Sequence, residues 1–287
     1  MSFQFFILFL LPVLFSAASS FRSPQTYNPT LASKYWDLCI ASYCPSSKIQ
    51  DWSIPFMKQR FPSVREVTVI HNTTGNSFGF LGYNADENEV WIVFRGTEPL
   101  SIKNWIDDFD FLFIDYAKCE GCRVHRGFYY TYMQIKDRIL GAAKDLFQKY
   151  PNAKKIVTGH SLGGALAVQA ILDIVENFGE IHEFYTYGAP RGGNKAFVDY
   201  INAKIKVNFN TRITHGKDPV PHLPFLGWGY WHIDREIFYE NGLDYVICEK
   251  GEDPNCSNKY WMATNVVDHL VYMGKDMAPY YLECNLL

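Results

Sequence analysis

A serine between glycines joins a predicted strand to a predicted helix, and this junction constrains the fold more than any other part of the chain. The segment Gly159-His160-Ser161-Leu162-Gly163 follows the β-rich run 155–158 and precedes an apolar helical run, 165–175. Small flanking residues let the chain turn sharply, so that the Ser161 hydroxyl stands at the helix N-terminus. The pattern is typical of a nucleophile elbow. The alternative interpretation is an ordinary glycine-rich turn.

Strand-like and helix-like runs alternate around this junction. Helical spacing covers 31–43, 128–150 and 195–205, and β-rich runs cover 66–71, 77–83, 90–95, 183–187 and 207–214. Alternating strands and helices favour a parallel sheet, whereas three closely spaced strands favour an antiparallel meander. We therefore predict an α/β fold with a mostly parallel central sheet and antiparallel N-terminal edge strands.

Length and composition fit one secreted globular domain. The chain has 287 residues, with 27 Lys+Arg against 30 Asp+Glu and a hydrophobic fraction of 48%. The charge balance argues against nucleic-acid binding, and the hydrophobic fraction argues against disorder. The apolar run 5–15 is too short to span a bilayer and precedes small residues, as in a secretory signal peptide. We predict a signal peptide over 1–20 and a single domain over 21–287; an uncleaved signal anchor is the alternative.

Seven cysteines call for an explanation in a chain of this size. In an oxidising compartment they are candidate crosslinks, and their spacing suggests pairs that are close in sequence. The expected pairs are Cys39 with Cys44, Cys119 with Cys122, and Cys248 with Cys256, which leaves Cys284 as a free thiol. No thioredoxin-like βαβ pattern surrounds the second pair, so a redox dithiol is disfavoured, and so is a zinc site.

A serine nucleophile needs a base and an acid. In folds with this kind of elbow, the three residues follow one another in the chain order Ser, Asp or Glu, His. Asp218 comes just after the predicted strand 207–214, at the sheet edge where such folds present site residues. His222 is too close to Asp218 in sequence to reach it easily from a separate loop. His232 and His269 remain as candidate bases, and composition does not separate them.

Six motifs in one order resemble the class 3 (fungal-type) triacylglycerol lipase family, which has an α/β-hydrolase fold with helices on both faces of the sheet. They are Val93-Phe94-Arg95-Gly96-Thr97, Val124-His125-Arg126-Gly127-Phe128, Gly159-His160-Ser161-Leu162-Gly163-Gly164-Ala165, Tyr187-Gly188-Ala189-Pro190-Arg191-Gly192-Gly193-Asn194, Asp218-Pro219-Val220-Pro221 and Asp268-His269. The resemblance implies Ser161 as nucleophile, Asp218 as acid and His269 as base. It also maps the oxyanion-hole donors to Thr97 and to the backbone N–H of Leu162.

The resemblance implies hydrolysis of triacylglycerols through an acyl-enzyme, with peripheral contact to a lipid surface and no metal or organic cofactor. We expect a monomer. Alternatives are an esterase or phospholipase on the same fold, an acyltransferase, and a non-catalytic lipid-binding homologue. Some family members have a long disulfide between the N-terminal region and the C-terminus, but the local pairing leaves Cys284 without a partner for it.

The segment 101–109 predicts a short amphipathic helix close to the site. Ile102, Trp105, Ile106 and Phe109 recur at helical spacing and form one apolar face, with polar residues on the other. The segment follows Thr97 and resembles the lids of fungal lipases more than the polar flaps of feruloyl esterases. We expect it to lie across the site as a lid; a helix fixed on the core is the alternative.

Overall fold

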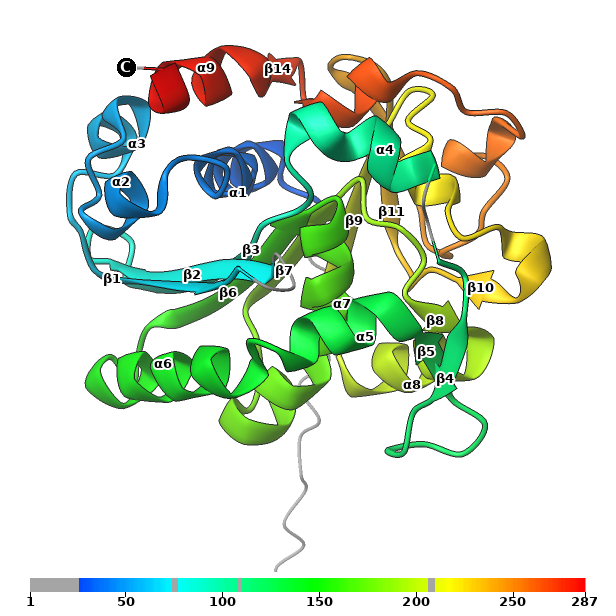
Figure 1. The fold of residues 1–287 in the computed structure, drawn as a ribbon, viewed down its shortest axis with the longest axis horizontal. Coiled ribbons are helices and arrows are strands. Elements are labelled where there is room, and N and C mark those ends of the chain that lie inside the picture. The colour runs from blue at the N-terminus through cyan, green and yellow to red at the C-terminus, as the bar shows by residue number, and fades with distance from the viewer. Residues whose placement is uncertain (1–25, 74–76, 108–109, 206–209, 287) are drawn as a thin grey trace, which may run out of the picture.

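A mixed eight-stranded sheet forms the centre of the molecule (Figure 1). The computed structural model describes residues 26–73, 77–107, 110–205 and 210–286, so the predicted signal peptide lies outside the described residues. In spatial order the strands are β1 (Val64–Asn72), β2 (Ser77–Asn84), β3 (Glu89–Phe94), β6 (Lys154–His160), β7 (Glu183–Tyr187), β9 (Asn210–His215), β11 (Glu236–Asn241) and β12 (Asp244–Cys248).

The middle of this sheet is parallel and both of its edges are antiparallel. β3, β6, β7, β9 and β11 pair in parallel, while β1, β2 and β12 run against their neighbours. The predicted α/β architecture with antiparallel N-terminal edge strands is therefore confirmed. The predicted β-rich runs include neither β11 nor β12, and residues 244–247 of β12 are exposed.

Helices cover both faces of the sheet (Figure 1). The helices are α1 (Pro29–Ala41), α2 (Ser46–Gln50), α3 (Pro55–Arg60), α4 (Ile102–Asp107), α5 (Arg126–Met133), α6 (Lys136–Lys149), α7 (Leu162–Phe178), α8 (Lys195–Lys204) and α9 (Ala278–Leu286). α1, α2, α3 and α9 lie on one face, and α5 to α8 on the other. No helix in the described part of the chain is long and apolar enough to cross a membrane.

The two faces bury two separate apolar clusters. Successive residues of β3 alternate between them, because side chains of a strand point to opposite faces. Ile92 and Phe94 pack with α6 and α7, whereas Trp91 and Val93 pack with α1. All four side chains are fully buried, so this strand is fixed from both sides. The residues that follow it, from Arg95 onward, start from a rigid position.

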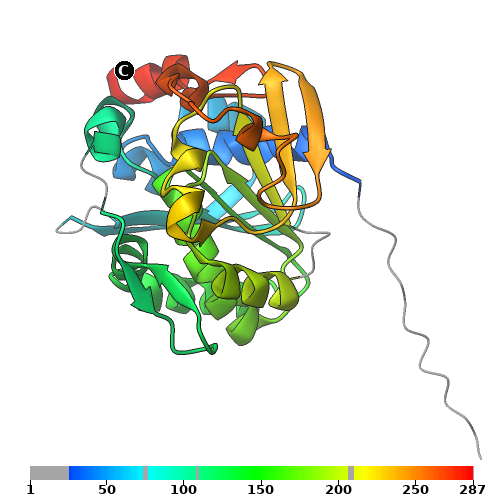
Figure 2. The same ribbon diagram turned by 90° about the vertical axis from the view of Figure 1, so that its right-hand side faces the viewer.

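Two smaller sheets complete the fold. One contains β4 (Phe113–Asp115), β5 (Arg123–His125), β8 (Gly193–Asn194) and β10 (Tyr230–Trp231), and the other β13 (Val271–Tyr272) and β14 (Lys275–Asp276). Figure 2 shows the β4–β5 hairpin standing apart from the main sheet. The predicted helix 128–150 is divided into α5 and α6, because the chain turns at Gln134 and buries Ile135 in the core.

The predicted bridge between Cys39 and Cys44 is wrong, and so is the predicted free thiol at Cys284. Cys44 pairs with Cys284, 240 residues away, with Cα atoms 5.5 Å apart. Cys39 lies inside α1 and points toward the sheet, where its sulfur lies 3.4 Å from Thr158 Oγ1. Cys44 follows the end of that helix and lies beside α9. The two residues therefore face different neighbours despite their short separation.

The other two bridges join the partners that their spacing predicts. Cys119 is bonded to Cys122 in the loop between β4 and β5, and Cys248 is bonded to Cys256 after β12. Cys39 is the free cysteine of the described residues, and burial raises its pKa to about 12. It is therefore an unreactive thiol in the folded protein.

Candidate active site

Ser161 stands at the turn between β6 and α7 in a strained backbone conformation. Its φ is 60° and its ψ is −131°, a combination that residues with a side chain rarely adopt. The flanking glycines permit the turn, because a Cβ on Gly163 would overlap the carbonyl oxygen of Phe94, and one on Gly159 would overlap that of Gly163. The Ser161 N–H donates to the Tyr187 carbonyl at 2.8 Å. The serine is therefore fixed at the N-terminus of a 17-residue helix.

The structure brings Asp218 and His269 into contact across 51 residues. His269 lies in a short 3-10 helix, η6 (Val266–Leu270), and its Nδ1 is 2.7 Å from Asp218 Oδ2. The carboxylate also accepts hydrogen bonds from Val220 N–H at 2.9 Å and from the Tyr272 hydroxyl at 3.1 Å. Burial and the nearby Asp218 raise the pKa of Tyr272 well above its usual value, so this hydroxyl remains a donor.

The bond to Asp218 assigns the protons of the His269 ring. A carboxylate is an acceptor, so Nδ1 carries the hydrogen, and Nε2 of the neutral ring is free to accept a proton. Within the described residues, neither His269 Nε2 nor Ser161 Oγ has a hydrogen-bond partner, and both atoms are buried. The His269 ring lies 4.5 Å from that of His160, the residue next to Ser161. A nucleophilic oxygen and a basic nitrogen are thus held unpaired in one buried place.

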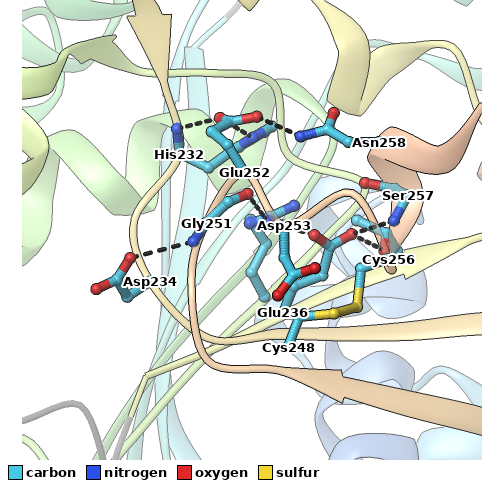
Figure 3. A network of polar contacts seen from close by, with 12 residues as sticks. His232, Asp234, Glu236, Cys248, Gly251, Glu252, Asp253, Cys256, Ser257 and Asn258 are labelled. Atoms are coloured by element: carbon cyan, nitrogen blue, oxygen red, sulfur yellow. Dashed lines mark hydrogen bonds and ion pairs between the residues drawn. A yellow bond between two sulfur atoms is a disulfide. The ribbon is translucent and has the colours of Figure 1, made fainter. Parts of the chain in front are cut away.

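His232, the other candidate base, has no free nitrogen. Its Nδ1 lies 2.9 Å from Glu252 Oε1, and its Nε2 lies 3.2 Å from the Ala189 carbonyl oxygen. Figure 3 shows this ring held by Glu252 in a polar network below β10. Because both nitrogens are occupied, the ring has no position at which to accept a proton from a serine. Hydrogen bonding thus separates the two histidines that composition left open.

Leu162 follows Ser161 in the chain, and Thr97 follows a glycine that lies against Ser161. Leu162 is the first residue of α7, where a backbone N–H has no carbonyl partner within the helix. Thr97 follows Gly96, and a Cβ built on Gly96 would lie 2.8 Å from Ser161 Cβ. Only a glycine permits so close an approach, so the turn that carries Thr97 presses against the serine. Two candidate donors to an oxyanion are therefore next to the nucleophile.

A hydrogen-bonded chain connects the three parts of this site through Tyr43 and His160, neither of which was predicted as a site residue. The Tyr43 hydroxyl lies 2.7 Å from His160 Nδ1, and His160 Nε2 lies 2.9 Å from the His269 carbonyl oxygen. The Gly96 N–H donates to the same Tyr43 hydroxyl at 3.2 Å. The chain thus joins the turn before Thr97, the elbow and the loop that carries His269.

The direction of each bond in this chain follows from one carbonyl. The His269 carbonyl can only accept, so His160 Nε2 carries the hydrogen. Burial, together with the nearby His269, lowers the pKa of His160 well below its usual value, so the ring is neutral and its Nδ1 accepts. Tyr43 must therefore donate to His160 while it accepts from Gly96. Tyr43 fixes both partners through one oxygen.

The α4 helix covers the site from the side of the elbow. Ile102 is buried, and Ile106 packs against a small apolar cluster of Phe128, Ala165 and Leu223, to which Leu162 also contributes. Lys103 and Asn104 are exposed. Trp105 belongs to α4, and Phe109 lies outside the described residues. Ile106 thus packs on the same cluster as Leu162 of the elbow, and Ser161 is fully buried.

Metal ligands are absent from the described residues: no group of three or more His, Cys, Asp or Glu side chains there could hold a metal ion.

Known proteins similar to this chain include fungal lipases. Residues 91–228 match the model of the lipase (class 3) family. The chain is 37% identical to a lipase of Rhizomucor miehei over 195 residues, which cover 66% of this chain and 53% of that protein. The chain spans about half to three fifths of the length of the curated relatives it matches.

Solved structures give the same result over nearly the whole chain. A lipase from Rhizopus microsporus var. chinensis has a TM-score of 0.79 and 30% identity, covering 88% of this chain and 90% of that one. A triacylglycerol lipase whose catalytic centre is formed by a serine protease triad has a TM-score of 0.78 and 28% identity, over 88% and 96% of the two chains. The chain belongs to the class 3 (fungal-type) lipase family, with the α/β-hydrolase fold.

Proposed function

We propose that the protein is a secreted, monomeric serine ester hydrolase that cleaves triacylglycerols at a lipid–water interface. One observation carries the proposal: Ser161 Oγ and His269 Nε2 are both buried and unpaired among the described residues, beside a His269–Asp218 pair at 2.7 Å. Acyl transfer from an ester needs a hydroxyl nucleophile and a base oriented by an acid. The similarity to triacylglycerol lipases supports the choice of substrate.

In the first half of the reaction, Ser161 Oγ attacks the acyl carbonyl of the ester while His269 Nε2 takes its proton. Asp218 orients the ring and stabilises the imidazolium that forms. The carbonyl oxygen gains negative charge, which the Thr97 N–H and hydroxyl and the Leu162 N–H stabilise by hydrogen bonds. His269 then gives its proton to the departing alcohol, and the acyl group remains on Ser161.

In the second half, a water molecule takes the place of the alcohol. His269 removes a proton from this water as its oxygen attacks the acyl-enzyme, and the same donors hold the new oxyanion. The proton returns to Ser161 Oγ as the ester bond to the serine breaks and the fatty acid leaves. No metal or organic cofactor takes part in either half.

In this proposal, α4 acts as a lid. Ile106 packs on the cluster that includes Leu162 of the elbow, Ile102 is buried, and Trp105 and Phe109 extend the same apolar face in the sequence pattern. Turning this face onto a lipid surface buries apolar area and opens the path to Ser161. A poorly soluble ester therefore suits the site better than a dissolved one.

Secretion and a single domain belong to the same proposal. The apolar run and the small residues after it form a signal peptide, 1–20, and residues 21–287 form one domain. Three disulfides among the described residues fit an oxidising compartment. The Cys44–Cys284 bridge ties both ends of the domain to each other, as expected of one folded unit.

The test is covalent labelling together with a substrate panel. An alkyl phosphonate ester should attach to Ser161, as located by peptide mass spectrometry, and the His269→Ala variant should not be labelled. The folded His232→Ala variant should still be labelled. Labelling that survives His269→Ala but not His232→Ala would make the assignment of the base wrong.

The panel compares emulsified triacylglycerols, phospholipids and dissolved short-chain esters. We expect the highest rate on the emulsion. Preference for dissolved esters or for phospholipids would support the esterase or phospholipase alternative. Ester synthesis that exceeds hydrolysis in the presence of an added alcohol would support the acyltransferase.

A further inference from the structure

Two exposed apolar side chains lie close in sequence to the base. Trp261 is 90% exposed and is the most exposed large apolar side chain of the described residues, and Met262 next to it is 57% exposed. Both lie in the segment between η5 (Ser257–Lys259) and η6, eight and seven residues before His269. Single exposed apolar residues are ordinary, but an adjacent Trp and Met beside a catalytic loop form a patch. We call these two residues the Trp261 prong.

The chain just before the prong is fixed by a buried carboxylate. Glu252 accepts hydrogen bonds from Arg191 at 2.9 and 3.0 Å, from Asn258 Nδ2 at 2.7 Å and from the His232 N–H at 2.7 Å (Figure 3). Arg191 also donates to two carbonyl oxygens of the loop after β9. The loop 249–259 is therefore bonded to the core at its centre and at its end.

A disulfide and a second buried carboxylate hold the same loop. Cys248 is bonded to Cys256, and Glu236 on β11 accepts hydrogen bonds from the Ser257 N–H at 3.2 Å and from Thr214 at 2.6 Å (Figure 3). On the far side of the prong, the Asn265 N–H donates to the Lys217 carbonyl at 3.0 Å. Both ends of the exposed segment are thus attached to rigid structure within a few residues.

A second exposed apolar group borders the other side of the site. It consists of Phe225, Leu226 and Trp228, around the short helix η4 (Leu226–Trp228), and these side chains are 37–50% exposed. The Trp228 ring lies 4.4 Å from that of Phe111, which packs on the same small cluster as Ile106 of α4. Figure 2 shows η4 (yellow) and the segment before η6 (orange) close together on one side of the molecule.

We propose that the Trp261 prong inserts into the lipid surface beside the active site and holds the enzyme there whether or not α4 is open. This inference rests on the proposed function. The loops that carry the prong and the η4 group are the same loops that carry His269 and Asp218, so a body that contacts both groups lies beside the catalytic pair. A protein partner in that position would block the substrate, whereas a lipid surface delivers it.

Rigidity gives the prong its effect. A segment whose flanking backbone is already held in place loses less conformational entropy on binding than a free loop, so more of the apolar burial contributes to affinity. The indole ring also suits the boundary between acyl chains and head groups, because it joins a large apolar surface to one N–H donor. The prong gives affinity and α4 gives access, so the two functions can be separated by mutation.

The experiment measures lipid binding and catalysis separately. The Trp261→Ser/Met262→Ser double variant is made in the full chain and also in the Ser161→Ala background, which binds lipid without consuming it. Flotation of triolein droplets coated with phosphatidylcholine in a centrifuge measures partition. We expect at least about a tenfold loss of partition from removing this apolar area. Hydrolysis of a dissolved short-chain ester should remain within about twofold.

The matched control is Tyr130→Ser/Met133→Ser. It removes an aromatic residue and a methionine that are 55% and 41% exposed on α5, on the face of the sheet away from α1. Partition of this control should not change. Three results would each overturn the inference. They are an equal loss of partition in the control, an unchanged partition of the prong variant, and a loss of hydrolysis of the dissolved ester that matches the loss of partition. If the wild type hydrolysed no ester, the proposed function would fail, and the Ser161→Ala proteins would still test the prong.

Discussion

Replacing Tyr43 by phenylalanine tests how the site is held together. The hydroxyl that is lost is almost completely buried and serves two partners, the Gly96 N–H at 3.2 Å and His160 Nδ1 at 2.7 Å. Each buried polar group left without a partner costs about 1–3 kcal/mol. We therefore expect the free energy of unfolding to fall by about 2–4 kcal/mol, because relaxation recovers part of the sum.

The effect on catalysis follows from the position of Gly96 next to Thr97. Complete removal of an oxyanion-hole donor lowers the turnover number by about 100- to 1000-fold. Tyr43→Phe displaces the turn without removing a donor, so we expect kcat to fall by about 10- to 100-fold. KM should change little, because the oxyanion exists only in the transition state.

The assay uses a dissolved short-chain ester, so that lid opening and lipid binding do not contribute. Tyr132→Phe is the matched control, because Tyr132 is equally buried and donates to Asp173 at 3.0 Å, away from Ser161. It should lose stability in urea unfolding and keep its kcat. Equal kcat losses in the two variants would show that Tyr43 acts through general stability. An unchanged kcat in Tyr43→Phe would refute the positioning role outright.

Four further predictions use other parts of the structure. Ser161→Ala should lower kcat by about 10⁴- to 10⁶-fold with an unchanged melting temperature. Trp105→Ser should reduce the rise in rate that occurs when an ester passes its solubility limit, and should spare the dissolved ester; equal losses would favour a fixed core helix. A thiol reagent should modify one cysteine, Cys39, and only after unfolding, which mass spectrometry of the labelled peptide checks. Burial lowers the pKa of His125 to about 4 and that of His160 well below its usual value. As the pH falls below about 6.5, the unfolded chain therefore binds protons at both histidines while the native protein does not. The free energy of unfolding should drop by about 1.4 kcal/mol per pH unit for each histidine. For His125 this drop should end at about pH 4, where the native protein also binds the proton. Urea titrations of wild type and His125→Asn check this, and an unchanged slope in the variant would contradict it.

The sequence predicts well those parts of the fold and site that depend on neighbouring residues in the chain. The strand, elbow and helix around Ser161 are continuous in the chain, and Asp218 follows the end of a strand, so neighbouring residues alone indicate both positions. Strand β12 and the break between α5 and α6 were beyond prediction, because exposure and packing decide them.

Contacts between distant segments could not be read in this way. The local rule for cysteines fails because the orientation of α1, and not the separation in sequence, decides which sulfur faces α9. Tyr43 lies 117 residues from His160, and no motif links them. His232 and His269 both have aromatic neighbours, and only their hydrogen bonds distinguish a fixed ring from a free one. Of the residues in the Tyr43–His160–His269 chain of hydrogen bonds, His160 could have been suspected from the sequence, since it lies inside the elbow motif itself.

The Cys44–Cys284 bridge also has a consequence for when the protein becomes active during its own synthesis. The bridge spans 240 residues, so it cannot close until everything between the two cysteines has been translated and has entered the oxidising compartment. Tyr43, which fixes the turn beside Ser161, is the residue next to that bridge. A nascent chain therefore holds a complete elbow long before the elbow has its final support. If the protein is secreted and attacks lipids, as proposed above, this order of events delays full activity until the chain has left the translocation site.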